Sequence, residues 1–531
     1  MNRQRLLPVI GFTLLAVCFA ISLLRVFNRQ RAESNPDEVI IRIAHWQLES
    51  GIRDAIDVLA RDYERLHPGV RIQQNPIPER IYPSWLKTQL VGGTAPDLIQ
   101  IGKGSDDETL ARFFVPLTDQ VEQPNPYNAG TNLAGQRWRD TFVDGLAGGD
   151  SYKPNLLEYY GVPLSMITIR MYYNVSEWQR ILGDTPPPAN YDEFISICER
   201  VQEHAAKTGR TIFPIAGSKY GTPWFASALI GSQTQRLAQR LDDTLVLRPV
   251  PIETSLQFLA GRWEIDEPEL ANGLQLARQI GRFAQPGFIQ ADRDDASFYF
   301  VQGRALMIVT GSWDAPTFRT LAPFELSAFQ LPLPSPDHPR YGAGVLGPTS
   351  EAETPTGTTF GLTKASRHAD RALDFLHFLT SRQGNGTFSE ISTWLPSVVD
   401  VELPPLVQPF APVIDGYVNG IGIDVGGGAS VRRVVDSNLN TLFDANADIA
   451  KLQDILRAEL PRAVREDLER TIYHFASNSS RQDTLLASQV VLRARRPDVA
   501  EHRRKQSELL EAQTMQELRR AWIVHELAPK E

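Results

Sequence analysis

A strand, a helix and a second strand follow one another between residues 39 and 73, and this order limits the chain to few folds. Residues 39–44 (VIIRIA) are rich in β-branched side chains, which predicts a buried strand. Residues 70–73 predict the second strand. Between them, apolar side chains recur at helical spacing, at Ile56, Leu59, Ala60, Tyr63 and Leu66. Two strands joined by a helix pair in parallel, so the sequence predicts an α/β fold with a parallel sheet.

Candidate ligand-binding residues follow two of the predicted strands. Ligands of open α/β sheets bind beyond the carboxyl ends of the strands, where Trp46 and Glu49 follow residues 39–44. A carboxylate at a helix start is the alternative for Glu49. Another predicted strand, residues 97–101, leads into a second loop, for which a solvated surface is the alternative to ligand binding. Its polar side chains that suit ligand hydroxyls are Lys103, Ser105 and Asp106.

The segment FVQGRALMIVTGSWD, residues 300–314, is the strongest single indication of function. It predicts a strand at residues 305–309 and a tight glycine turn that presents Trp313, followed by Asp314. An indole offers a flat apolar face and one N–H donor, which suits the face and hydroxyl rim of a sugar ring. Burial in the core is the alternative for Trp313, because large aromatic side chains are usually buried.

Length, charge and composition exclude several classes of protein. A chain of 531 residues predicts two or more lobes. A net charge of −9 argues against nucleic-acid binding. The nine histidines form no HExxH motif and there is no CxxC, so no metal or other cofactor is expected. Cys18 lies in the N-terminal apolar segment, so we expect no disulfide between it and Cys198.

The N-terminal residues 1–27 predict a membrane segment. Arg3 and Arg5 precede residues 6–24, an uncharged run about as long as a bilayer core is thick. The run lacks a clear Ala-x-Ala exit, which favours an uncleaved anchor over a cleaved signal peptide. The letters LAVC, ending at Cys18, leave a lipoprotein as a further alternative. Residues 28–38 are polar and predict a linker.

Several segments match a known family in the same order along the chain. These are AHWQLES, LARDYERLHPGVRI, LVGGTAPDLIQIG, YGVPLSMITIRMYYN, FVQGRALMIVTGSWD, GTTFGLTKASRHADRALDFLHFLTS and WLPS. Together they resemble the extracellular solute-binding proteins of ABC importers, in the maltose-binding-like, sugar-binding branch called family 1. The resemblance covers roughly residues 38–470. It implies a two-lobed periplasmic-binding-protein fold (type II-like), whose hinge strands let the lobes close over a ligand.

The resemblance also implies lobe boundaries and a binding site. Residues 39–164 and 335–383 would form lobe 1, and residues 165–334 and 384–476 would form lobe 2. The binding positions carried over are Trp46, Glu49, Lys103, Ser105, Ser165, Trp224, Trp313, Asp314 and Trp394. The chain departs from the family in residues 477–531, a mixed-charge tail that predicts helices. We expect a solvated helical extension there rather than a helix that binds a partner.

Catalytic motifs are incomplete. Residues 84–87 match S-x-x-K without the partner motifs, and the glycines of residues 420–428 lack a following Lys-Ser/Thr pair. Asp106 and Asp107 are adjacent carboxylates of a kind that could serve a glycosidase, but such pairs are usually solvated. We therefore expect no enzyme, but a receptor anchored at the outer face of the cytoplasmic membrane that delivers a mono- or oligosaccharide to an ABC permease. A membrane-tethered ligand-sensing subunit is the main alternative, and a carbohydrate-active enzyme is a remote one.

Overall fold

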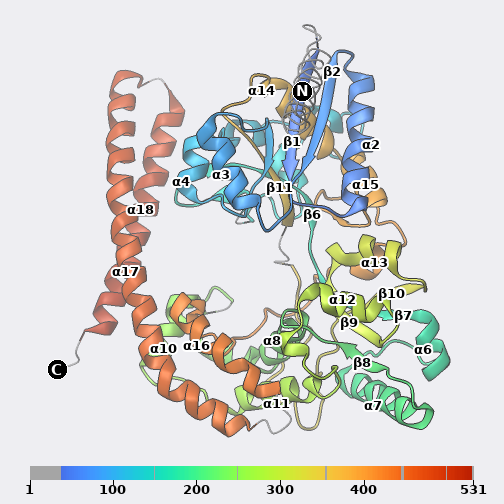
Figure 1. Cartoon of the computed structure of the whole chain (residues 1–531). Coiled ribbons are helices and arrows are strands. Elements are labelled where there is room, and N and C mark those ends of the chain that lie inside the picture. The colour runs from blue at the N-terminus through green and yellow to red at the C-terminus, as the bar shows by residue number, and fades with distance from the viewer. Residues whose placement is uncertain are drawn as a thin grey trace, which may run out of the picture.

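The computed structural model describes residues 38–148, 150–247, 249–352, 356–443, 448–497 and 499–528. These residues form two lobes, each built around its own sheet, with a pair of long helices along one side (Figure 1). The mixed α/β, two-lobed fold predicted from the sequence is confirmed. The predicted anchor at residues 1–27 lies outside the described residues, as does the linker up to residue 37. Among the helices that are described, none is long and apolar enough to cross a membrane.

The first lobe contains the predicted strand–helix–strand unit. β1 pairs in parallel with β2 (Ile41 opposite Ile72), and β11 enters the sheet antiparallel to β3 and β6. In order across the sheet, the strands are β12 (Leu395–Pro396), β6 (Val162–Met166), β11 (Thr356–Leu362), β3 (Leu98–Gln100), β1 (Val39–His45) and β2 (Val70–Pro76). The helices of this lobe are α2 (Ser50–Leu66), α3 (Tyr82–Gly92), α4 (Asp107–Phe113), α5 (Thr118–Val121), α14 (Ala369–Leu379) and α15 (Arg382–Ser392).

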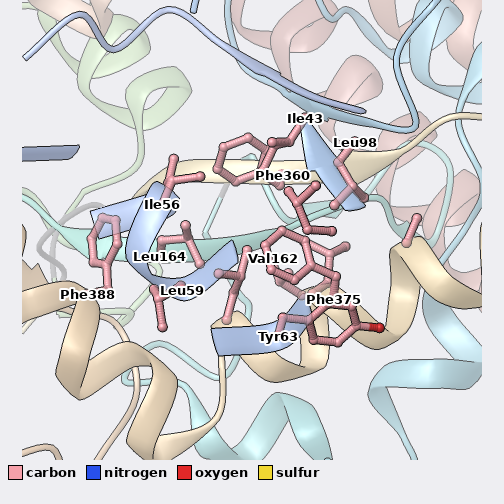
Figure 2. Packing of buried hydrophobic residues seen from close by; sticks show 14 of the residues in the cluster. Ile43, Ile56, Leu59, Tyr63, Leu98, Val162, Leu164, Phe360, Phe375 and Phe388 are labelled. Carbon is pink, nitrogen blue, oxygen red and sulfur yellow. The ribbon is translucent and has the colours of Figure 1, made fainter. Parts of the chain in front are cut away.

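The apolar face of α2 explains the packing of the first lobe. Its residues Ile56, Leu59 and Tyr63 are buried against the sheet and against Phe375 and Phe388, from α14 and α15 (Figure 2). These side chains are spaced three or four residues apart on α2, so they share one face of the helix. These three residues, which the sequence placed on one helix face, are therefore residues that α2 buries in the core.

The second lobe has a smaller sheet. β7 pairs antiparallel with β9 and β10, and β8 pairs in parallel with β9. In order, its strands are β10 (Leu326–Phe329), β7 (Ile169–Asn174), β9 (Ala305–Gly311) and β8 (Phe213–Ala216). Its helices are α6 (Val175–Leu182), α7 (Tyr191–Thr208), α8 (Gly221–Gln233), α9 (Gln235–Leu241), α10 (Pro251–Leu259), α11 (Pro268–Gly281), α12 (Arg293–Val301), α13 (Ala315–Leu321) and α16 (Ala429–Leu439).

In the described part of the chain, three segments pass between the lobes: β6 to β7, β10 to β11, and the stretch after β12. β12 pairs with β6, and α15 packs against α2, so the chain stays in the first lobe beyond residue 383, where the predicted boundary had begun lobe 2. Residues 335–352, assigned to lobe 1 from the sequence, lie against the second lobe. Within them, Leu346 N donates to Gln235 Oε1 at 2.8 Å.

A buried arginine ties the three crossing segments together. Arg170, in β7, makes a two-pronged ion pair with Glu351, with Nη1–Oε1 at 2.6 Å and Nη2–Oε2 at 2.8 Å. Its guanidinium also donates to the carbonyls of Pro409 (3.1 Å) and Ala411 (2.6 Å). Glu351 in turn accepts a bond from Val413 N at 2.8 Å. One side chain thus fixes the start of β7 against both other segments.

The C-terminal helices α17 (Ile449–Arg495) and α18 (Ala500–Leu527) form an antiparallel hairpin, to which the predicted helical tail belongs (Figure 1). The hairpin is joined to the second lobe by an apolar cluster. From the hairpin, this cluster buries Leu452, Leu456, Leu460, Ala463, Val464, Leu468 and Ile523. We call this part of the hairpin its root.

Candidate functional site

Trp46 lies at the carboxyl end of β1, next to the loop that follows β3. Its backbone N–H donates to Gln100 Oε1 at 3.2 Å, which fixes the residue to the end of the neighbouring strand. Its ring meets Tyr82 edge to face, with centroids 4.9 Å apart. The Lys103 ammonium lies 6.0 Å from the indole centroid, within range of a cation–π contact. The two loops that the sequence placed at one sheet edge are therefore in contact.

The polar side chains in the loop of residues 102–106 differ in the contacts that they make. Lys103 forms an ion pair with Glu79. Burial lowers the pKa of Lys103, and the nearby Arg293 guanidinium lowers it further. Ser105 is buried, and its hydroxyl has no hydrogen-bond partner among the described residues. Asp106 caps α4 by accepting from Thr109 N at 2.8 Å, so this carboxylate has a structural role.

Trp313 follows β9, as the sequence predicted, but the strand continues to Gly311. The chain then makes one short 3₁₀ turn, Ser312–Asp314. A Cβ atom on Gly311 would lie 2.1 Å from the Trp313 ring, so only glycine lets the indole fold back over the strand end. Trp224, from α8, meets the Trp313 ring edge to face at 5.7 Å. Trp313 also packs against the core of the first lobe, so it touches both lobes.

Two carboxyl groups, one from each lobe, lie near this aromatic pair. Asp314 is buried and accepts a hydrogen bond from Thr310 Oγ1 at 2.5 Å. Burial raises the pKa of Asp314, while the positive charge of Arg293 opposes the rise. Burial also raises the pKa of Glu49, and the charge of Asp314 raises it further. The two carboxyls therefore interact across the junction between the lobes.

Arg293 is a charged residue near the candidate site that was not predicted from the sequence. It begins α12, and its charge acts on Glu49, Lys103 and Asp314. The sequence feature that could have drawn attention to Arg293 is the run Asp292–Asp295. In this run, Asp292 and Asp295 form a capping box at the start of α12. A charged residue within such a run is ordinarily a solvated helix start, which is why it did not stand out.

Ser165 and Trp394 lie inside the first lobe rather than on its surface. Ser165, in β6, is buried and its hydroxyl lies 3.2 Å from Thr358 Oγ1 in the neighbouring strand. Trp394 is buried in the first-lobe core just before β12. Because Pro396 pairs with Ser165, the two candidates are close to each other. β11 separates β6 from β3, the strand that leads into the loop of residues 102–106.

Several candidate residues hold buried polar atoms that the described protein does not satisfy. They are Glu49 Oε2, Ser105 Oγ, Trp313 Nε1 and Trp394 Nε1. Trp313 Nε1 is close enough to lower the pKa of Asp314, but makes no hydrogen bond of normal geometry. Nearly all buried polar groups in native proteins are hydrogen-bonded, so such atoms suit a ligand or water. No group of three or more His, Cys, Asp or Glu in the described residues could hold a metal ion.

Comparison with known proteins places the chain among binding proteins. The multiple sugar-binding protein of Streptococcus mutans is 23% identical over 391 residues, which cover 73% of this chain and 80% of that protein. The solute-binding protein RafE in complex with raffinose has a TM-score of 0.51 at 16% identity, covering 80% of this chain and all of that one. The maltose/maltodextrin-binding domain MalE from Bdellovibrio bacteriovorus, bound to maltotriose, has a TM-score of 0.50 at 16% identity, covering 81% and 100% of the chains.

At these identities the solved structures establish the shared fold. The family follows from the sequence itself, because residues 59–410, more than half of the chain, match the family described as bacterial extracellular solute-binding protein. The two lobes and their connecting segments agree with that match. The chain therefore belongs to the bacterial extracellular solute-binding proteins.

Proposed function

We propose that the protein binds a carbohydrate at the junction between its lobes, outside the cytoplasmic membrane, and delivers it to an ABC importer. The family supports an extracellular solute as the ligand. The names of relatives support a sugar, since they include a multiple sugar-binding protein and proteins solved with raffinose and maltotriose. Another relative, from Pyrococcus horikoshii, is named an ABC transporter extracellular-binding protein, which supports the importer as partner.

The observation that carries the proposal is the grouping of aromatic faces with unsatisfied polar atoms where the lobes meet. Trp313 and Trp224 offer apolar ring faces, and Glu49 and Asp314 offer acceptors for hydroxyl groups. A sugar needs both kinds of contact, because its ring has an apolar face and a polar rim. Hinge movement would then close the lobes over the ligand, driven by contacts that are better in the closed state.

We expect binding without chemical turnover. A matching sugar at a concentration 100 times its Kd should add about 2.7 kcal/mol to the free energy of unfolding. The melting temperature should therefore rise. A thermal-shift screen of mono- and oligosaccharides measures this, and chromatography of the released ligand shows whether it is unchanged. The reason is that the chain matches a family described as solute-binding proteins. Hydrolysed or modified sugar from a clean preparation would refute the proposal.

We also propose that residues 6–24 remain as a membrane anchor, with Arg3 and Arg5 on the cytoplasmic side. The linker of residues 28–38 would reach about 20 Å as a flexible coil, enough for the lobes to meet a neighbouring permease. N-terminal sequencing of the protein from the membrane fraction should return the unprocessed N-terminus. A mature chain that starts near Ala32 would indicate a cleaved signal, and one that starts at a lipidated Cys18 would indicate a lipoprotein. Either result excludes the anchor.

A further inference from the structure

The hairpin of α17 and α18 contacts both lobes. Its root lies in the apolar cluster of the second lobe, and its far part runs alongside the first lobe on the side of α4 (Figure 1). There, Lys505 Nζ lies 2.8 Å from Glu158 Oε1, and Gln516 Nε2 donates to Asn155 Oδ1 at 3.4 Å. Both partners belong to a small ribbon of the first lobe, β4 (Tyr152–Lys153) and β5 (Glu158–Tyr159), with its connecting turn. We call this contact the dock.

The dock is partly shielded from solvent. The side chains of Lys505 and Glu158 are 26% and 15% exposed. A charge-assisted hydrogen bond in such surroundings is stronger than an exposed surface pair, because water and salt screen it less. The side-chain contacts that make up the dock are polar, so contacts with water can replace them when the hairpin separates from the ribbon.

The two ends of the hairpin are held by different forces. The root buries a row of leucines, whereas the side chains that α17 buries beyond Leu468, among its described residues, are Ser479 and Gln482. Neither end of the Gln482 amide has a hydrogen-bond partner among the described residues. Buried amides without partners cost free energy. In α18, the far part also buries Leu509 and Gln516. The far part thus buries fewer apolar side chains than the root, which fits a permanent attachment at one end and a releasable one at the other.

The dock is connected to the loop of residues 102–106. Asn155, which accepts from Gln516, donates through Nδ2 to Asp107 Oδ2 at 2.9 Å. Asp107 is the first residue of α4 and directly follows that loop. On the other side of the ribbon, Asp150 Oδ2 lies 3.2 Å from where a Cβ on Gly102 would be. A shift of the loop therefore moves groups that the hairpin touches.

We propose that the hairpin is a brace between the lobes: fixed in the second lobe and docked on the β4–β5 ribbon, it holds one interlobe angle and must release for the lobes to move. A hinge movement that opens or closes the lobes on the side of the hairpin changes the distance between root and ribbon, so the dock restricts the angle between the lobes. Because the ribbon adjoins residues 102–106, docking and ligand occupancy are coupled in both directions. This coupling rests on the proposed sugar site, whereas the bracing does not.

The test measures the distance between the lobes without ligand. Spin labels at Val91→Cys and Lys207→Cys report it, since both positions are highly exposed and lie in α3 and α7 of opposite lobes. Cys18→Ser removes one of the two native thiols. The other, Cys198, is buried, so the spin label should not react with it. The full chain should give one narrow distance distribution. Lys505→Glu should broaden or shift it, and should speed hydrogen exchange in the ribbon roughly tenfold, the factor expected when a charge-assisted bond is lost.

Two control variants separate the dock from general charge effects. Lys505→Arg keeps the donor and should keep the distribution. Arg504→Glu makes the same charge change one residue away and should also keep the distribution. Arg504 Nη1 lies 3.5 Å from Glu508 Oε1, on the same helix. Gln516→Ala tests the second contact without a charge change and should speed exchange in the ribbon. Equal distributions for the full chain and Lys505→Glu, or equal broadening by Arg504→Glu, would overturn the brace. Because no sugar is present, this outcome is independent of the sugar site.

Discussion

Replacing Trp313 by alanine should weaken sugar binding by about 2 kcal/mol or more, roughly 30-fold in Kd, as for other buried aromatic anchors. The indole lies at the end of β9, contacts Trp224 and touches both lobes, so its removal takes away an apolar face and an N–H donor where the lobes meet. Isothermal titration with a sugar found by the thermal-shift screen measures the loss. Melting without ligand shows whether the variant is folded.

A graded variant distinguishes the two properties of the Trp313 indole. Trp313→Phe keeps an aromatic face but loses the N–H, so it should retain more affinity than the alanine variant and less than the native protein. The binding interpretation is wrong if Trp313→Ala collapses the melting temperature while its folded fraction binds sugar normally. That result would assign Trp313 to the interlobe core, the alternative left open by the sequence.

Replacing Arg170 by alanine should lower the free energy of unfolding by about 3–5 kcal/mol, the usual cost of removing one member of a buried ion pair. The Arg170 side chain is only 1% exposed and its removal leaves Glu351 and the carbonyls of Pro409 and Ala411 without their donor. All three lie on segments that cross between the lobes. Urea unfolding followed by circular dichroism and by tryptophan fluorescence measures the change and shows whether the lobes unfold together.

Arg180→Ala provides a matched control for this loss. The Arg180 side chain is about half exposed and pairs with Glu177, which keeps a second partner in Arg210, so the loss of Arg180 should cost about 0–1 kcal/mol. Arg170→Lys should give an intermediate loss. One ammonium cannot replace a guanidinium that donates two hydrogen bonds to a carboxylate and further hydrogen bonds to two carbonyls. A change for Arg170→Ala no larger than that for Arg180→Ala would contradict the structural role given to this residue.

Sequence periodicity predicted the parts of the fold that repeat over many residues. The buried face of α2, with Ile56, Leu59 and Tyr63, and the β1–β2 pair could both be predicted, because each pattern extends over more residues than chance would produce. β12 was not readable, since a strand of two residues has no period. It belongs to the first sheet only because β6 is there to pair with it. This is why the predicted change of lobe after residue 383 differs from the observed path of the chain.

The candidate site was predictable to the extent that it follows strand ends. Trp46 and the loop of residues 102–106 lie together because β1 and β3 are neighbours in parallel. The position of Ser165 inside the sheet depends on β11 and β12, which lie far away in the sequence. Arg293 and the dock of the hairpin depend on contacts between lobes. No local pattern encodes such contacts, so they appear only in three dimensions.

The strand order of the first sheet has a consequence for when that lobe can fold. β6 lies between β11 and β12, and its residue Met166 pairs with Leu395, which is 395 − 166 = 229 residues later in the chain. At a synthesis rate of about 5–20 residues per second, roughly 10 to 45 seconds pass between the two. Until β11 is made at residues 356–362, β6 has neither neighbour and presents two open edges, which invite pairing with other chains. The lobe that is made first is thus completed only after most of the second lobe has been synthesised, which gives a secretion or chaperone system time to engage an unfolded chain.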